Sequence, residues 1–272
     1  MHLNLTWKQQ WSRLFCFFKP TLATLILAAT LWVTPLLAQS TTEAHLLFGS
    51  LKNSSFAGGG STDTWTATVQ HASGWALGDL FFFFDMINPE DASLDIYGEA
   101  YPSLSLAKIS GGSVSLGPIR DISLLMGFNW AADANVRKYL PGVGISWDIP
   151  GFLFLNTWVT AFLDGSGGVD SGGAPSESSS FMVDVNWGYP LEIGGVSLSL
   201  EGHIEYIGSR SDEFGQDVSW WINGQPQIRL DLGKLLYGES GQLFIGTEYW
   251  IWVNKLGDPR TDESAFEALL AW

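Results

Sequence analysis

The sequence predicts an all-β protein, a transmembrane antiparallel up-and-down β-barrel of about twelve strands. Three observations favour this class. Apolar and polar residues alternate strictly in many segments, which is typical of strands with one apolar face. Several of these segments are long enough to cross a bilayer at a tilt. Tryptophan and tyrosine gather near the segment ends, as they do at membrane interfaces.

The composition excludes three other classes of protein. Of the 272 residues, 46% are apolar and 14% are aromatic, which excludes long disorder. The formal net charge of −15 excludes a basic nucleic-acid binder, so no nucleic acid polymer is expected as a partner. The single cysteine, Cys16, excludes a miniprotein held by disulfides.

The first segment, residues 1–38, is predicted to be a secretory signal peptide, and residues 39–272 are predicted to form the barrel. Three bases and no acid precede an apolar stretch at 21–38, which is the pattern of a cleavable leader. The alternative is an uncleaved transmembrane anchor, which Pro35 disfavours because proline breaks a helix. Without the leader, 10 bases face 28 acids, the net charge is −18, and no cysteine is left.

The clearest predicted strand runs from Leu94 to Leu106, where thirteen residues alternate without a break. The same alternation predicts twelve strands, with roughly ten or fourteen as alternatives because boundaries from sequence are uncertain by a few residues. The predicted strands are 44–51, 63–72, 77–87, 93–107, 118–131, 139–149, 152–164, 180–190, 195–208, 217–232, 240–254 and 262–272.

The direction of the apolar faces separates a barrel from a soluble sandwich. In a sandwich the apolar faces form the core, whereas in a transmembrane barrel they meet lipid and the polar faces line the lumen. The chain ends on an alternating segment that closes with Trp272. A terminal strand that ends in an aromatic residue is what the outer-membrane assembly machinery commonly recognises. We therefore predict a barrel, with outer-membrane lipid and that machinery as partners.

An even number of strands puts both ends of the barrel domain on the periplasmic side. The outer loops then include the Gly/Ser-rich connection 165–179, and tight periplasmic turns include 149–151 and 192–195. Pro102 and Pro226 fall within predicted strands, where we expect local bulges.

The polar faces predict a lumen rich in acids and aromatic rings, with Arg229 as essentially its one base. The inward acids are Asp79, Asp85, Asp95, Glu99, Asp121, Asp148, Asp164, Asp184, Glu201, Glu205, Asp231 and Glu248, and the inward rings are Phe81, Phe83, Tyr97, Tyr101, Trp158, Phe162, Phe244, Trp250 and Trp252. Such a lining repels anions, accepts hydrogen bonds from neutral hydroxylated solutes and stacks on planar bases or sugars. The structural alternative is that several of these acids are protonated or bridged by water, and that several of the rings merely fill a narrow barrel. The residues predicted to bind substrate are Asp79, Phe81, Phe83, Asp85, Tyr97, Glu99, Tyr101, Glu201, Arg229, Glu248 and Trp250.

His203 lies between Glu201 and Glu205 on one strand face, which suggests hydrolytic chemistry. Residues two apart on a strand are roughly 7 Å apart, so direct pairing is loose. No serine elbow, phosphate loop, dinucleotide motif or metal-ligand spacing accompanies it. We expect no enzyme activity, no catalytic residue, no metal and no cofactor.

Several segments resemble the nucleoside-specific channel-forming outer-membrane proteins, the Tsx-like family. They are GDLFFFFD (78–85), LDIYGEAYPSLSL (94–106), LPGVGISWDIPGF (140–152), PQIRLDLGKL (226–235) and EYWIWVNKLG (248–257), followed by DESAFEALLAW. The resemblance implies a narrow twelve-stranded barrel that passes nucleosides and deoxynucleosides, with Asp79, Phe81, Phe83, Asp85 and Glu99 facing inward. The chain departs from the family at Ser103 and Asp184, where the nucleoside channel carries basic residues, so this lumen is more acidic.

The predicted function is an outer-membrane channel of a Gram-negative cell for nucleosides or similar small neutral solutes. One alternative is a near-closed surface barrel that serves as a receptor for a phage or another partner. The other is a cation-selective general porin, which the many bulky inward rings disfavour.

Overall fold

The computed structural model describes residues 40–90, 93–112, 114 and 116–272. These residues belong to one compact unit, Gln39–Trp272. The predicted signal peptide, 1–38, lies outside the described residues. Within the described part of the chain, no helix is long and apolar enough to cross a membrane.

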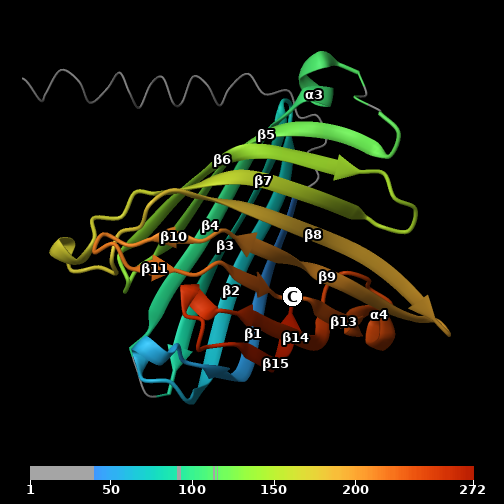
Figure 1. The fold of residues 1–272 in the computed structure, drawn as a ribbon. Helices are drawn as coiled ribbons and strands as arrows, with labels where there is room; N and C mark the ends of the chain where they lie inside the picture. Colours follow the sequence, from blue (N-terminus) through green and yellow to red (C-terminus); the bar gives the residue numbers. More distant parts are fainter. Residues whose placement is uncertain (1–39, 91–92, 113, 115) are drawn as a thin grey trace, which may run out of the picture. The chain divides into compact units, whose positions relative to one another are not determined.

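Antiparallel strands form the wall of the unit, and short helices and turns lie in its connections (Figure 1). The wall strands are β1 (Ser40–Lys52), β2 (Ser61–Trp75), β3 (Gly78–Pro89), β4 (Asp95–Ser105), β5 (Ile119–Ala131), β6 (Val136–Trp147), β7 (Phe154–Asp164), β8 (Ser180–Ile193), β9 (Val196–Ile207), β12 (Trp221–Gly224), β13 (Gln227–Asp231), β14 (Phe244–Val253) and β15 (Glu263–Ala271). The connections hold η1 (Ser55–Ala57), α3 (Leu106–Ser110), η2 (Val169–Ser171), the hairpin β10 (Arg210–Ser211) and β11 (Asp217–Val218), α4 (Leu232–Tyr237) and η3 (Lys255–Gly257).

The sheet closes on itself as a barrel. Each wall strand pairs with the next in sequence, and β1 pairs with β15. β12 and β13 both pair with β9 on one side and β14 on the other, so together they occupy one position in the wall. The described strands therefore make twelve wall positions, which confirms the predicted fold class and strand number. Closure also removes the free edges that an open sheet would leave unpaired.

The two ends of the barrel differ. One end, here called the loop end, carries η1, η2, η3 and the β10–β11 hairpin. The other, here called the helix end, carries α3, α4, the tight β8–β9 turn and both ends of the described chain, where Ala44 and Trp272 exchange backbone hydrogen bonds. The β8–β9 turn was predicted correctly, and its glycines Gly194 and Gly195 both have positive φ, as a tight hairpin turn requires.

Two connections at the helix end begin with short helices where the sequence predicts extended strand: α3 follows β4, and α4 follows β13. The Ser105 side chain accepts a hydrogen bond from the Lys108 backbone N–H, and the Asp231 side chain accepts one from that of Lys234. Each caps the first turn of a short helix, α3 or α4. Side-chain capping therefore stops β4 and β13 where alternation alone would extend them.

The two prolines do not produce the expected bulges. The pairing register of β4 with β5 is the same on either side of Pro102, and that of β9 with β12 and β13 is the same on either side of Pro226. Gly202 on β9 leaves room for the neighbouring chain just before Pro226. Its φ is +135°, and a Cβ at this position would lie 2.3 Å from the Gln225 carbonyl oxygen. A register shift does occur in β5, between Ile119 and Asp121.

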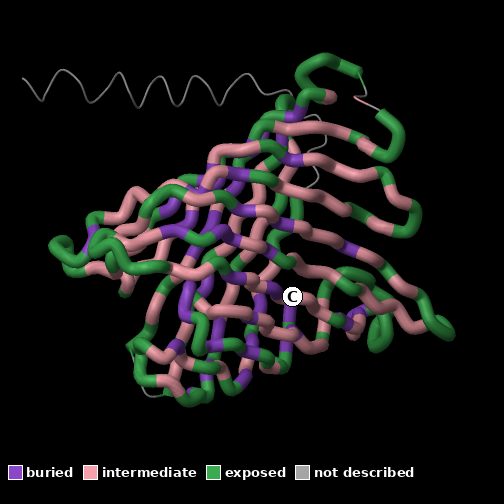
Figure 2. Tube along the Cα trace, in the orientation of Figure 1, coloured by how far each residue is buried: buried purple, intermediate pink, exposed green. Residues whose placement is uncertain are grey.

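Burial alternates along the strands (Figure 2) and fixes the direction of each face. The exposed positions are apolar on nearly every wall strand: Leu46, Val69, Phe84, Met86, Leu104, Leu124, Met126, Val143, Val159, Phe181, Ile204, Ile228, Ile245, Phe266 and Leu270. Their neighbours in sequence are buried or half-buried, and many of them are polar, such as His45, Asp85, Thr160, Glu205, Arg229 and Glu267. The apolar face is thus outside and the polar face inside, which is the reverse of a soluble protein and rules out a sandwich.

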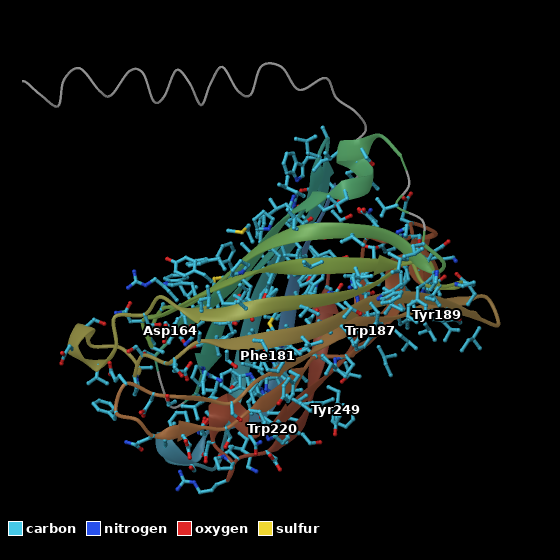
Figure 3. The ribbon with its side chains drawn as sticks, turned by 45° about the horizontal axis from the view of Figure 1, so that its top comes forward. Asp164, Phe181, Trp187, Tyr189, Trp220 and Tyr249 are labelled. Carbon is cyan, nitrogen blue, oxygen red and sulfur yellow. The ribbon has the colours of Figure 1, made fainter. Side chains whose placement is uncertain are left out.

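Aromatic side chains accompany the outer apolar face. Figure 3 labels Trp187 and Tyr189 toward one end of β8, with Asp164 near the loop end. At the loop end, Trp65 packs against Phe48 with ring centroids 4.6 Å apart, and it is 45% exposed. Exposed and half-exposed rings near strand ends fit the membrane-interface pattern predicted from the sequence.

Candidate functional site

Ten of the eleven predicted binding residues lie on the inner face of the described barrel. Asp85, Glu99, Tyr101, Arg229 and Glu248 are buried, whereas Phe81, Phe83, Tyr97, Glu201 and Trp250 are half-buried. The exception is Asp79, whose side chain is 58% exposed at the helix end and pairs with Lys108 of α3 at 2.7 Å. Asp79 therefore fixes α3 to the rim instead of lining the lumen.

Other acids predicted to face the lumen hold loops in place. Asp148 is exposed in the turn after β6, because the strand ends one residue earlier. Asp121 accepts hydrogen bonds from Ser105 and the Ala107 backbone at the start of α3. Asp231 caps α4, and Asp95 accepts a hydrogen bond from the Asp133 backbone at the rim. The inner acids are therefore fewer than the alternation predicts.

A polar and aromatic cluster occupies the inner face of β3, β4 and β5. Glu99 accepts hydrogen bonds from Tyr101 (2.7 Å), Asn129 (3.0 Å) and Tyr97. The Tyr101 ring lies 4.7 Å from the Trp158 ring, and Phe83 lies 6.0 Å from Tyr97 between ring centroids. We call Tyr97, Glu99, Tyr101 and Asn129 the Glu99 cluster. It brings hydrogen-bonding oxygens and nitrogens next to flat apolar faces.

His203 does not pair with the two glutamates beside it on β9. Its Nδ1 lies 2.9 Å from Oδ2 of Asp184 on β8, and its Nε2 lies 3.0 Å from Oε1 of Gln225. A diagonal neighbour on β8 and a residue of the β12–β13 connection thus replace the loose neighbours at two residues' distance. Both ring nitrogens of His203 are engaged in these contacts, so in this conformation the side chain has a structural role.

Arg229 lies fully buried near the helix end, between carboxylates from two strands. Its guanidinium is 3.0 Å from Glu201 and 3.0 Å from Glu43, and it sits 4.1 Å from the centroid of Phe244. Glu43 also accepts a hydrogen bond from Gln70 at 3.1 Å. The sequence prediction missed Glu43 because it placed the first strand at 44–51, whereas β1 begins at Ser40.

A ring of large apolar side chains fills the inner space toward the loop end. Its buried members, which we call the inner aromatic cluster, are Tyr101, Leu140, Phe162, Met182, Ile207, Trp221 and Trp252, with Phe81, Trp158 and Trp250 packed against them. Leu140 is 0% exposed. These side chains come from β3, β4, β6, β7, β8, β9, β12 and β14, so they narrow the interior along that part of the wall.

A charged network sits directly on this cluster. The Arg210 guanidinium, from the β9–β12 loop, lies 4.1 Å from the Trp221 ring centroid and donates to Glu177 at 2.8 and 3.0 Å. Lys138 reaches the same Glu177 at 2.6 Å and Asp164 at 3.1 Å. Lys138 is thus a second inner base beside Arg229; the sequence prediction missed it because it began this strand at residue 139, whereas β6 begins at Val136. Nothing in the strand alternation signals Arg210 or Glu177, which belong to loops.

Backbone hydrogen bonds tie the loops to one another at the loop end. The Ser178 N–H donates to Ser211, and the Glu213 N–H donates to Ser176, so the β7–β8 and β9–β12 loops pair. The Ala174 N–H donates to Ala134 of the β5–β6 connection at 2.7 Å. The loop end is therefore a connected cap over the inner aromatic cluster.

Asp258 joins two more loops of this cap. Its carboxylate accepts hydrogen bonds from the Ser55 backbone N–H (3.0 Å) and side chain, and from Thr261 Oγ1 (2.7 Å). Burial alone would raise the pKa of Asp258, but the hydrogen bonds from Ser55, Thr261 and Arg260 hold that pKa well below its ordinary value. At neutral pH the ionised carboxylate thus anchors the β1–β2 loop.

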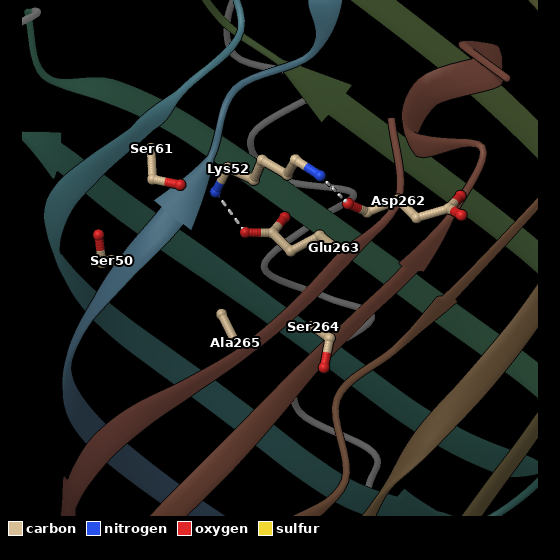
Figure 4. A pocket seen from close by; sticks show the side chains of 7 residues that line it. All are labelled: Ser50, Lys52, Ser61, Asp262, Glu263, Ser264 and Ala265. Carbon is tan, nitrogen blue, oxygen red and sulfur yellow. Dashed lines mark hydrogen bonds between the residues drawn. The ribbon is translucent and has the colours of Figure 1, made fainter. Parts of the chain in front are cut away.

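The wall has one short seam. β1 pairs with β15 only from His45↔Ala271 to Gly49↔Glu267, although both strands continue toward the loop end. A hollow of about 430 Å³ lies there, lined by Ser50, Lys52, Ser61, Asp262, Glu263, Ser264 and Ala265 (Figure 4). Side chains bridge the gap: Lys52 Nζ donates to the Asp262 carbonyl at 2.7 Å, and the Lys52 backbone N–H donates to Glu263.

Comparisons with known proteins yield no family membership. No family model matches the chain, and no curated protein matches its sequence. Among solved structures, a NanC porin is similar with 12% identity, a TM-score of 0.49 and coverage of 84% of this chain and 97% of that one. A KdgM porin follows with 7% identity, a TM-score of 0.46 and coverage of 85% and 98%. The transport unit of the Escherichia coli autotransporter AIDA-I has 10% identity, a TM-score of 0.31 and coverage of 92% and 95%.

Because every one of these TM-scores is below 0.5, the twelve-position barrel is taken from the strand pairing of the chain itself. The resemblance to the nucleoside-channel family stays a prediction.

Proposed function

We propose that this protein is an outer-membrane channel for small, uncharged solutes, with nucleosides as the substrate class. The observation that carries the proposal is the inverted barrel: an apolar outer surface around a polar and aromatic interior. An apolar outer surface is stable in contact with lipid, whereas its exposure to water is unfavourable in free energy. The proposal includes export by the leader at 1–38 and insertion by the outer-membrane assembly machinery through β15.

The width of the passage favours a selective channel over a general porin. The inner aromatic cluster and the Arg210–Glu177 pair occupy space inside the barrel near the loop end. A wide, water-filled lumen needs inner positions free of such bulk. Small solutes that displace water and stack on rings are the ones this passage suits.

The Glu99 cluster supports nucleosides in particular. A base has a flat face for the rings of Phe81, Phe83 and Trp158, and its sugar has hydroxyls for the oxygens of Glu99 and Asn129. Stacking is worth about 1–3 kcal/mol per base in nucleic-acid binders. The buried inner carboxylates outnumber the inner bases Lys138, Arg210 and Arg229, so phosphorylated solutes are repelled.

The test is solute uptake into proteoliposomes. Adenosine uptake is expected to be saturable and to exceed that of adenosine monophosphate. Replacing Phe81 and Phe83 together by alanine is expected to weaken the apparent affinity about tenfold, because a stacking contribution near 1.4 kcal/mol is lost. Phe84→Ala is the matched control, since Phe84 is 44% exposed on the outer face. Equal uptake of nucleoside and nucleotide, or an effect of Phe84→Ala as large as that of the inner pair, would contradict the proposal.

A second candidate is a near-closed surface barrel that acts as a receptor for a phage or another partner. The capped loop end favours it, because the β5–β6, β7–β8 and β9–β12 loops are hydrogen-bonded to each other above the inner aromatic cluster. This candidate predicts no uptake in the same assay.

A further inference from the structure

Two glutamates face each other on adjacent strands of the inner wall. Glu248 on β14 and Glu267 on β15 are direct cross-strand partners. Such partners have Cβ atoms about 5 Å apart, and like charges directly opposite each other destabilise a sheet. Both side chains are buried, at 5% and 1% exposure. Two ionised carboxylates in this position repel each other, so the pairing needs either a proton or a positively charged group between them.

No base of the described chain forms an ion pair with either glutamate. Glu248 accepts a hydrogen bond from the neutral amide of Gln227 at 2.7 Å. Oε1 of Glu267 is buried without a hydrogen-bond partner among the described residues. The cations around them are engaged elsewhere: Lys255 pairs with Glu263, Arg229 pairs with Glu43 and Glu201, and His203 pairs with Asp184.

A third buried acid, Asp85, also lacks an ion-pair partner within the described chain. Among the described residues, Asp85 accepts a hydrogen bond only from the hydroxyl of Thr68, at 2.6 Å. None of the three acids takes part in an ion pair within the described chain. Buried carboxyl groups without an ion-pair partner either take up a proton or bind a counter-charge.

The surroundings select the kind of cation. Within the described residues, no three His, Cys, Asp or Glu side chains are arranged to hold a metal ion. Trp250 follows Glu248 on the same inner face, with the small Ala265 as its cross-strand partner, and it stands 6.3 Å from Trp252 between ring centroids. A pair of carboxylates on the same inner wall as two indole rings has the chemistry to bind an ammonium or a guanidinium group, through charge-assisted hydrogen bonds and cation–π contact.

We propose that Glu248 and Glu267 form a binding site for the cationic nitrogen group of a solute, an ammonium or a guanidinium. Gly49 on β1 makes room for the Glu267 side chain, since a Cβ there would lie 2.6 Å from Glu267 Cγ. The site goes beyond the proposed function, because it binds a charged group and does so whether or not the barrel conducts.

The test is equilibrium binding to the folded full-length barrel in detergent, measured by calorimetry. The probes are methylguanidinium and methylurea, which share a shape but differ in charge, and potassium ion alone as a third arm. Methylguanidinium is expected to bind and methylurea is not. Glu267→Gln is expected to weaken methylguanidinium about tenfold or more, since one charge-assisted hydrogen bond is lost.

Two controls separate the site from general charge effects. Glu90→Gln and Glu239→Gln remove the same charge from exposed connections at the two ends of the barrel and are expected to leave binding unchanged. Glu248→Gln repeats the test if Glu267→Gln does not fold, as judged by heat-modifiable gel mobility. Equal binding of methylguanidinium and methylurea by the unaltered protein would overturn the proposal. Binding of potassium as tight as that of methylguanidinium would also overturn it, in favour of a simple electrolyte site. Failure of nucleoside uptake would leave these measurements untouched.

Discussion

Arg210 lies buried over the inner aromatic cluster, so removing it tests whether the loop end is closed at this point. The guanidinium is 0% exposed, donates twice to Glu177, and lies over the rings of Trp221 (4.1 Å) and Phe162 (5.2 Å). Arg210→Ala removes these contacts together with the volume of a long side chain. We expect the single-channel conductance of the variant to rise, because the vacated space has room for about two or three water molecules.

The cost in stability follows from the same contacts. A charge-assisted hydrogen bond contributes about 1.5–3 kcal/mol, and a desolvated cation–π contact contributes about 2 kcal/mol. Breaking a buried pair costs roughly 3–5 kcal/mol when the remaining charge is left alone. Here Lys138 still neutralises Glu177 at 2.6 Å, so we expect a loss near the lower end, about 3 kcal/mol, in the free energy of unfolding in lipid vesicles.

Arg210→Lys is the matched control. It keeps the positive charge and most of the volume but cannot make the two parallel hydrogen bonds to Glu177. We expect nearly unaltered conductance and a smaller loss of stability. If folded Arg210→Ala and Arg210→Lys conduct alike, and both conduct like the unaltered protein, the reasoning that places the constriction at Arg210 is wrong.

Three further predictions follow from single sites. Gly202→Ala should lower the free energy of urea unfolding by about 1–3 kcal/mol, because φ is +135° and the new Cβ would meet the Gln225 carbonyl oxygen at 2.3 Å; a neutral result would refute the close approach. Met126→Arg, at a side chain 64% exposed on the outer face, should cost about 2–4 kcal/mol in lipid vesicles if that face meets the membrane interior, and an unaffected stability would argue against lipid contact. The pKa of Asp258 is lowered, so its stabilising effect on the Ser55 loop should be complete above the unfolded-state value near 4 and fade as pH falls through the lower folded-state pKa; hydrogen exchange in that loop should separate Asp258→Asn from the unaltered protein at pH 7 but not in strong acid.

The wall of the barrel could be predicted from the sequence because one physical rule governs it. A strand has a side-chain period of two, and a membrane barrel keeps one face apolar along its whole length, so the alternation from Leu94 to Leu106 fixes both the strand and the direction of its faces. The same rule placed Phe81, Glu99 and Arg229 inside.

The connections could not be read in that way, because they depend on single hydrogen bonds instead of a period. The side chains of Ser105 and Asp231 each cap a helix of one or two turns, which leaves almost no trace in hydropathy. Arg210 and Glu177 meet across two loops whose sequences carry no alternation. Lys138 and Glu43 were missed for a simpler reason: they lie one residue outside the predicted strand boundaries.

Glu267 is the instructive case among the inner residues. The alternation of the last strand puts Ser264, Phe266, Ala268 and Leu270 on one face, which places Glu263 and Glu267 on the other face. The sequence alone does not give the cross-strand partner of Glu267. That partner depends on the register between β14 and β15, which puts Glu267 opposite Glu248.

Single-channel recording in planar bilayers, with adenosine added, tests the channel most directly. If the inverted barrel carries nucleosides past the Glu99 cluster, the unaltered protein will show a small conductance that adenosine blocks in a saturable way. A large current that adenosine leaves unchanged would contradict the account in favour of a general porin. The absence of any current would contradict it in favour of a closed receptor barrel.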